Sequence, residues 1–134
     1  MIYFDTDVLV NLFLQQDPIK YEFTNDLYIE TSGRGEFFVS LLCLQETSFV
    51  LHKLSQDRAK IEQTLDSLFL HMPMYYGTAH FKRAIELARK IGFQHINDCL
   101  HTAIAEEYCN ELYTFNKADF KRIQKHTELK ITIF

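Results

Sequence analysis

The sequence contains few residues that interrupt secondary structure, with four Gly and two Pro among 134 residues. Hydrophobic residues make up 47% of the chain, which is enough to build a core and excludes a disordered protein. No apolar run approaches the roughly 18 residues that span a bilayer, and the N-terminus lacks the basic, apolar and small-residue order of a signal peptide. We therefore expect one folded domain over residues 1–134, located in the cytoplasm, with no membrane partner.

Cysteine is also scarce and lacks paired spacing. The three cysteines, Cys43, Cys99 and Cys109, form no Cys-x-x-Cys group, and their odd number without an export signal indicates reduced thiols. This pattern excludes a disulfide scaffold and a thiolate zinc site. The six histidines show no ligand spacing, and no glycine-rich phosphate loop is present. The histidines therefore indicate no enzyme site of their own.

Positive charge is in deficit overall, because the formal net charge is −4. Its distribution is uneven: residues 115–134 carry +3, which leaves −7 for residues 1–114. Residues 80–90 form a second basic cluster with Lys82, Arg83, Arg89 and Lys90. This distribution is compatible with a site that collects carboxylates while its rim contacts the phosphates of a nucleic acid. The alternative for each basic cluster is a solvated helix face.

Apolar periodicity and capping residues predict alternating strands and helices. The predicted strands cover residues 2–4, 36–40, 72–76, 112–115 and 131–134. The predicted helices cover residues 8–14, 19–31, 41–55, 58–70, 78–91, 98–109 and 117–125. Short strands that alternate with helices predict an α/β fold, a three-layer α/β/α sandwich around a central parallel sheet.

Asp5 directly follows the first predicted strand. Ligands of open α/β sheets bind beyond the carboxyl ends of the strands, so this position favours a functional role. An Asp after a strand is also common as a helix N-cap. We expect Asp7 to be better placed for capping, which would leave Asp5 free for another role.

Glu46 lies in the apolar stripe of its predicted helix. Residues three and four positions apart share a helix face, and here Leu42, Cys43, Phe49 and Val50 flank the carboxylate. Burying an isolated carboxylate is costly, so such a group pairs, takes up a proton or binds a metal ion. No Lys or Arg occupies this stripe near Glu46, which favours a functional carboxylate over a structural ion pair.

Two further acids lie at the ends of elements. Asp98 opens a helix rich in small residues, where it could simply complement the helix dipole, and Asp119 follows the strand at 112–115. Asn116 offers a neutral oxygen between them. If Asp5, Glu46, Asp98 and Asp119 converge, two carboxylates about 4 Å apart repel by roughly 4 kcal/mol at an effective dielectric near 20. A hard divalent cation such as Mg²⁺ or Mn²⁺ offsets this repulsion.

These motifs, taken in order, resemble those of PIN-domain nucleases, especially the VapC-type toxins of toxin–antitoxin pairs. The opening Ile-Tyr-Phe-Asp-Thr-Asp resembles the family's strand that ends in Asp-Thr-(Asn/Ser). Glu46 in Leu-Gln-Glu-Thr-Ser-Phe and Asp98 in Ile-Asn-Asp-Cys-Leu-His-Thr-Ala-Ile-Ala match its second and third acids. Residues 114–120, Thr-Phe-Asn-Lys-Ala-Asp-Phe, match its last signature. The sequence departs from the family pattern at two positions. Asn116 replaces a common Asp, so the fourth ligand could be Asn116 or Asp119. Asp7 replaces the usual Asn or Ser.

The resemblance implies a metal-dependent endoribonuclease that hydrolyses RNA phosphodiester bonds with one or two Mg²⁺ or Mn²⁺ ions. It also implies a homodimer and a protein antitoxin as partner. The acids Asp5, Glu46, Asp98 and Asp119 are the expected catalytic and metal-binding residues, with Asn116 as an additional ligand. The expected substrate-binding residues are Thr114, Lys117, Lys121 and Arg122.

Two alternatives stay open at this point. A phosphatase of the haloacid-dehalogenase type also begins with a strand and Asp-x-Asp, and its first Asp is a nucleophile. Here Val8 and Leu9 stand where that family has Gly-Thr. The other alternative is a PIN-like module that has lost catalysis and binds a protein partner. Asn116 in place of the common Asp is compatible with such a loss.

Overall fold

A four-stranded parallel sheet forms the centre of the protein, described here by a computed structural model that covers residues 1–134. The strand order is β2-β1-β3-β4, with strands at Ile2–Phe4 (β1), Phe37–Phe38 (β2), Glu111–Thr114 (β3) and Lys130–Ile133 (β4). Ile2 pairs with Phe37 on one side and with Glu111 on the other. The carboxyl ends of β1 and β3 therefore lie side by side.

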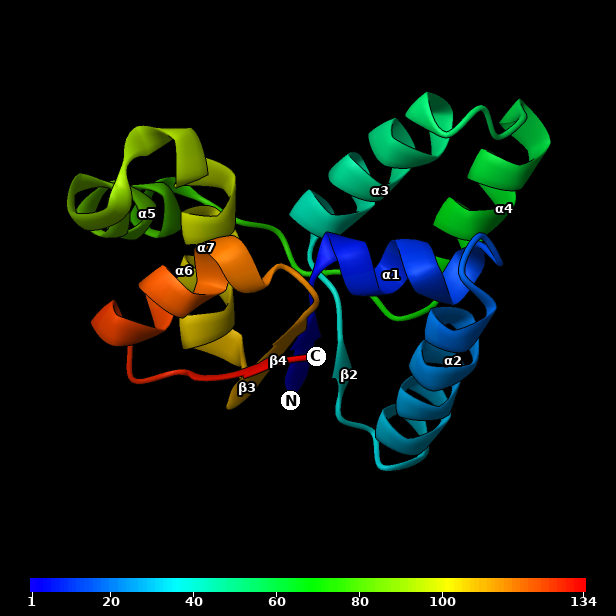
Figure 1. Ribbon diagram of the computed structural model, residues 1–134, viewed down its shortest axis with the longest axis horizontal. Helices are drawn as coiled ribbons and strands as arrows, with labels where there is room; N and C mark the ends of the chain where they lie inside the picture. Colours follow the sequence, from blue (N-terminus) through cyan, green and yellow to red (C-terminus); the bar gives the residue numbers. More distant parts are fainter.

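Helices cover both faces of this sheet and form two groups (Figure 1). The first group comprises α1 (Thr6–Phe13), α2 (Pro18–Gly33), α3 (Leu41–Lys53) and α4 (Arg58–Phe69). The second comprises α5 (Thr78–Ile91), α6 (Ile96–Tyr108) and α7 (Lys117–Ile123), with single 3₁₀ turns η1 (Phe93–His95) and η2 (Gln124–His126). This arrangement confirms the predicted three-layer α/β/α fold. None of the helices combines the length and apolar character that crossing a bilayer requires.

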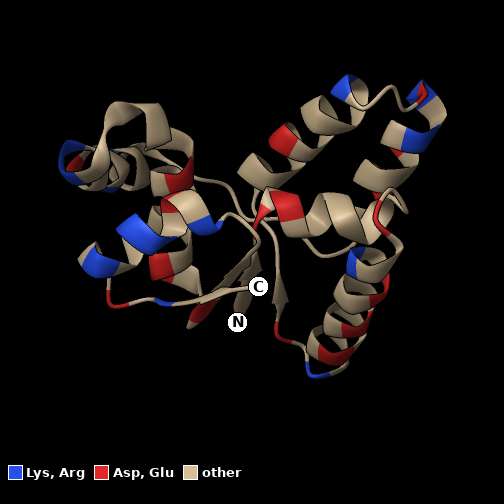
Figure 2. Ribbon diagram, in the orientation of Figure 1, with Lys and Arg blue, Asp and Glu red and all other residues tan.

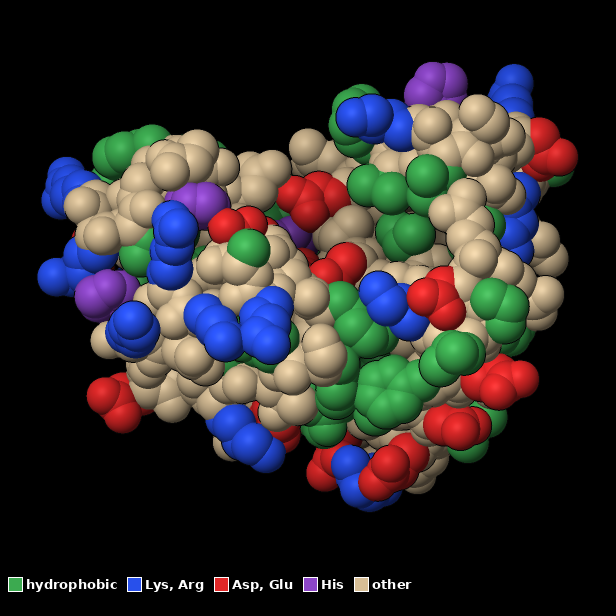
Figure 3. Space-filling view, viewed as in Figure 1, with side chains coloured by type: hydrophobic (Ala, Val, Ile, Leu, Met, Phe, Trp, Pro, Cys, Tyr) green, Lys and Arg blue, Asp and Glu red, His purple; other side chains and the backbone are tan.

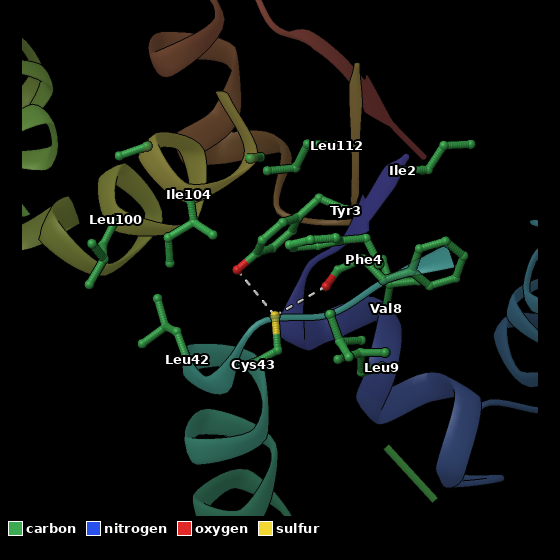
Figure 4. Close-up of a cluster of buried hydrophobic side chains, with 14 of the residues drawn as sticks. Ile2, Tyr3, Phe4, Val8, Leu9, Leu42, Cys43, Leu100, Ile104 and Leu112 are labelled. Carbon is green, nitrogen blue, oxygen red and sulfur yellow. Dashed lines mark hydrogen bonds between the residues drawn. The ribbon is translucent and has the colours of Figure 1, made fainter. Parts of the chain in front are cut away.

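The central strands are buried because helices cover both faces of a parallel sheet. Tyr3 and Phe4 of β1 have no exposed surface, and they pack with residues of α3 and α6 (Figure 4). Within this core the Cys43 thiol donates hydrogen bonds to the Tyr3 hydroxyl at 3.2 Å and the Phe4 carbonyl at 3.4 Å. The core thus fixes the strand that ends at Asp5.

Some predicted boundaries were wrong. The expected strand at 72–76, which contains Pro73, is reduced to an isolated bridge between Ser40 and Met74, and the strand at 36–40 is only two residues long. Asp5, rather than Asp7, caps α1, because the helix begins one residue after Asp5. The helix predicted at 98–109 begins two residues earlier, at Ile96, directly after η1.

Candidate metal centre

Asp5 stands at the junction of β1 and α1, where the sheet holds its backbone. Its N–H donates to the Tyr113 carbonyl at 3.0 Å, which ties Asp5 to the end of β3. The side chain is almost fully buried, and it accepts hydrogen bonds from the Thr6 N–H and the Thr114 hydroxyl, each at 2.8 Å. Burial raises the pKa of Asp5, and these hydrogen bonds oppose that rise. The carboxylate is thus fixed in one orientation, with both oxygens bonded.

Asp7 is the second residue of α1 and faces the same strand end. Its Oδ2 accepts from the Phe115 N–H at 3.0 Å and lies 3.3 Å from the Thr114 hydroxyl, while its Oδ1 is buried without a hydrogen-bond partner. Burial and then the charge of Asp5 raise the pKa of Asp7 to about 7. Asp7 therefore adds a fifth acid beside Asp5 instead of capping the helix.

Glu46 points from α3 toward the ends of β1 and α6. Its Oε2 accepts from the Thr6 hydroxyl at 2.7 Å and from His101 Nε2 at 2.6 Å. Burial would raise the pKa of Glu46, but the hydrogen bond and charge of His101 outweigh it, so the pKa is lowered. Glu46 is therefore an ionised, oriented carboxylate.

His101 lies beneath the acids and contacts two of them. Its Nε2 is 3.7 Å from Asp5 Oδ1 as well as 2.6 Å from Glu46, and its Nδ1 shares a 2.7 Å hydrogen bond with the Tyr3 hydroxyl. Burial alone would lower the pKa of His101, but the charge of Asp5 and the contacts with Cys43 and Glu46 raise it well above its ordinary value. Contact with the buried imidazole thus favours the ionised forms of Asp5 and Glu46.

Asp98 occupies the first turn of α6. Burial, followed by the charge of Asp5, raises the pKa of Asp98 to about 8, and Asp119 adds to this rise while His101 opposes it. Burial is the largest cause of this rise in the pKa, and the negative charges of Asp5 and Asp119 add to it. Asp98 is therefore electrostatically part of the same group as Asp5 and Asp119.

Asp119 lies on α7, where Asn116 and His95 hold it. Asn116 caps α7: its side-chain oxygen accepts from the Asp119 N–H at 3.3 Å, and its Nδ2 donates to Asp119 Oδ2 at 2.9 Å. His95 Nδ1 is 3.0 Å from Asp119 Oδ1. One ligand atom each from His95, Asp98 and Asp119 lie within 4.8 Å of one another, an arrangement that could hold a metal ion.

These side chains surround a cleft of about 270 Å³. In the space-filling view, acidic side chains line a hollow between the two helix groups, with histidine atoms visible inside it (Figure 3). The lining includes four of the five predicted ligands together with Asp7: Asp5, Asp7, Glu46, Asp98 and Asn116. Asp119 does not line the cleft itself but adjoins it through Asp98. The structure therefore brings the distant acids together.

No lysine or arginine forms an ion pair with any of these acids; only histidines do. Along the ribbon, acidic positions from both helix groups approach one another near the centre of the molecule (Figure 2). The predicted basic residues Lys117, Lys121 and Arg122 are exposed on α7, outside the cleft. Thr114 is fully buried, and its hydroxyl supports Asp5 from behind.

Comparison with known families identifies the fold. The sequence model of the PIN domain matches residues 2–126 of the chain. The chain belongs to the PIN-domain family. The structure is also similar to a chain in the crystal structure of VapBC2 from Rickettsia felis bound to a DNA fragment from their promoter. The TM-score is 0.62 and the sequence identity 20%, and the match covers 100% of this chain and 99% of that chain. No curated protein matches the sequence.

Sequence reasoning missed two histidines of this PIN domain. His95 and His101 were set aside because their spacing lacks a ligand pattern, yet both contact predicted site acids. The acids that they contact lie on α3 and α7, so the spacing of residues within η1 and α6 could not reveal these contacts. The available signal for His101 was its position among the buried, apolar residues of α6, the same argument that singled out Glu46 on α3.

Proposed function

We propose that this PIN-domain protein is a metal-dependent endoribonuclease that hydrolyses RNA phosphodiester bonds and acts as the toxin of a toxin–antitoxin pair. PIN domains are generally nucleases. The observation that carries the proposal is the convergence of Asp5, Glu46 and Asp98 on one cleft without a lysine or arginine partner. Membership of the PIN-domain family also counts against the alternative of a haloacid-dehalogenase-type phosphatase.

The donor set fits Mg²⁺ or Mn²⁺, one or two ions. It consists mainly of carboxylate oxygens, which such hard cations prefer. The buried Oδ1 of Asp7 lacks a hydrogen-bond partner, which indicates a local excess of acceptors. Asp5, Asp98 and Asp119 would be the ligands, with Asn116 as a neutral addition. When bound, divalent ions in such sites polarise the phosphate and lower the pKa of the attacking water.

The protein's own residues orient these groups. Thr6 and His101 hold Glu46 in place from two sides, so that Glu46 could ligate or orient the attacking water. Thr114 holds Asp5 through its buried hydroxyl, a positioning role in place of the substrate contact expected from the sequence. A carboxylate held by two donors requires little reorganisation during the reaction.

The remaining features of the proposal concern partners. Lys117, Lys121 and Arg122 would contact the phosphates that flank the cleaved bond, since all three are exposed on the helix that carries Asp119. A protein antitoxin is supported by the similarity to VapBC2, which was solved as a complex. Three free cysteines are compatible with a cytoplasmic protein. We also propose a homodimer, as the resemblance to VapC-type toxins implies.

Cleavage of defined RNAs by the purified protein tests this function. We expect cleavage with Mg²⁺ or Mn²⁺ and none with excess chelator. Asp5→Asn keeps the side-chain shape but removes the charge, and it should slow cleavage by 100-fold or more, since even indirect changes around a metal lower activity by roughly 10–100-fold. The matched control is Asp66→Asn, which removes an exposed carboxylate of α4.

Equal cleavage in chelator would contradict the metal mechanism. Wild-type protein that cleaves no RNA in Mn²⁺ but binds a protein partner tightly would instead support a catalytically silent binding module.

A further inference from the structure

His95 faces the acid cluster from the single turn that precedes α6. Its side chain is 13% exposed, and the Asp119 side chain opposite is 25% exposed. The ring directs Nδ1 toward Asp119, whereas Nε2 is buried and has no hydrogen-bond partner. The only polar atoms that the ring meets are therefore those of the acid cluster.

The contact between His95 Nδ1 and Asp119 Oδ1, at 3.0 Å, places a ring nitrogen against a carboxylate oxygen. A neutral imidazole with its proton on Nδ1 donates a hydrogen bond to that oxygen, and its Nε2 has no other partner in the structure. The same two atoms can instead ligate a divalent cation, which then takes the place of the proton, as in other metal sites with imidazole and carboxylate ligands.

Asp98 supplies the third donor from the next turn of the chain. The three donor atoms lie within 4.8 Å of one another. Ligands of one octahedral ion with bonds of about 2.1 Å lie roughly 3 to 4 Å apart, so small side-chain rotations bring the three donors around one cation.

We propose that His95 is a nitrogen ligand and that, with Asp98 and Asp119, it forms a mixed nitrogen–oxygen site that selects a transition metal ion, Mn²⁺, over Mg²⁺. The inference rests on the metal site of the proposed function and assigns the ligands of one part of that site, around His95, Asp98 and Asp119. The other part, around Asp5 and Glu46, has only oxygen donors facing the cleft.

Ligand chemistry gives this site its selectivity. Mg²⁺ prefers oxygen ligands and sheds its water reluctantly, whereas imidazole suits first-row transition metals. An all-carboxylate site discriminates little between Mg²⁺ and Mn²⁺, because both accept oxygen donors. One imidazole in place of an oxygen shifts the preference toward Mn²⁺, so the His95 site fills with Mn²⁺ first.

Electron spin echo spectroscopy of the full chain tests the ligand directly. Mn²⁺ is added well below one ion per chain, and the spectrum should show modulation from a directly bonded ¹⁴N nucleus. His95→Asn removes the imidazole but keeps an amide near the position of Nδ1, and it should abolish the modulation. The exposed His52, replaced by Asn, is the matched control and should leave the spectrum unchanged.

Calorimetric titration with each metal alone provides the second measurement. His95→Asn should weaken Mn²⁺ binding by roughly tenfold, the lower range for loss of a metal-site interaction, and should change Mg²⁺ binding much less. Equal losses for the two ions would overturn the assignment, as would a wild-type Mn²⁺ spectrum without nitrogen modulation. The latter measurement needs no variant and stays decisive if His95→Asn does not fold.

RNA cleavage, assayed in parallel, separates the two proposals. Nitrogen modulation without any cleavage would contradict the proposed function and support the ligand assignment. Cleavage without nitrogen modulation, or modulation that persists in His95→Asn, would overturn the role of His95 alone.

Discussion

His101 Nε2 lies 2.6 Å from Glu46 Oε2, although the two residues are 55 positions apart and belong to helices on opposite sides of the site. The imidazole is 1% exposed and the Glu46 side chain 22% exposed. Behind the imidazole, the Tyr3 hydroxyl anchors Nδ1 at 2.7 Å. One buried ring therefore connects the first strand, α3 and α6 at the point where the acids meet.

Replacing His101 by Leu should destabilise the protein and change the charge state of Glu46. The variant leaves a largely buried carboxylate without its main donor, so the free energy of unfolding should fall by about 1–3 kcal/mol. The pKa of Glu46 should rise, because His101 is what lowers it. Denaturant unfolding and carbon NMR of the Glu46 carboxyl group measure the two effects. The exposed His52→Leu should change stability by less than about 0.5 kcal/mol.

The metal-free protein should lose stability as the pH rises from about 4 to about 8. The pKa of Asp98 is raised from 3.8 to about 8, so in this window the folded chain holds a proton that the unfolded chain releases. The slope for one such proton is at most about 1.4 kcal/mol per pH unit. Asp7, with its pKa raised from 3.8 to about 7, acts in the same direction.

Asp98→Asn should reduce this slope and make the metal-free protein more stable than wild type near pH 8. Urea unfolding at several pH values, in chelator, provides the measurement, with the exposed Asp66→Asn as control. A wild-type stability that rises steadily from pH 4 to pH 8 would show that the buried acids do not repel one another as the geometry indicates.

Divalent metal should stabilise the fold by mass action. At a concentration about 100 times its dissociation constant, Mn²⁺ should raise the free energy of unfolding by about 2.7 kcal/mol, provided that the unfolded chain does not bind it. Thermal melts with and without Mn²⁺ measure this effect. Asp5→Asn should lose most of the increase, whereas Asp66→Asn should keep it. If Mn²⁺ does not change the melting temperature of the wild type, the protein has no preformed metal site.

Thr114→Val should disturb Asp5 while leaving the shape of the core almost unchanged. The valine lacks the hydroxyl that donates to Asp5 Oδ2 at 2.8 Å, so a buried carboxylate oxygen loses its partner. We expect a loss of about 1–3 kcal/mol in the free energy of unfolding. Thr114→Ser keeps the hydroxyl and should retain metal binding. If the valine and serine variants bind Mn²⁺ equally well, Thr114 does not position Asp5.

Much of the fold was predictable from the sequence, because its signals are local. The apolar run Ile2–Phe4, the proline at position 18 after Asp17 and the capping Ser40 each mark an element where the structure has one. The strand at 36–40 was predicted too long, because only Phe37 and Phe38 find partners along β1. Strand length depends on a neighbour that the local sequence does not reveal.

The site was predictable only in part, for the same reason. Glu46 could be recognised because a carboxylate in an apolar stripe is anomalous on its own helix. The contacts of His95 with Asp119 and of His101 with Glu46 depend on how separate helices pack, and no local pattern encodes them. The exchange of roles between Asp5 and Asp7 depends on whether α1 begins at Thr6 or later, a shift of one or two residues.

The strand order also has a consequence for biosynthesis. Asp5 is synthesised before the strand that supports it, Glu111–Thr114, and before the acids Asp98 and Asp119. A nascent chain that stops before Asp98 lacks β3, one of the two sheet neighbours of β1, and two of the five acids. Translation products that end before this residue would therefore contain no assembled acid cleft, and the proposed activity could arise only after β3 and α7 have been synthesised.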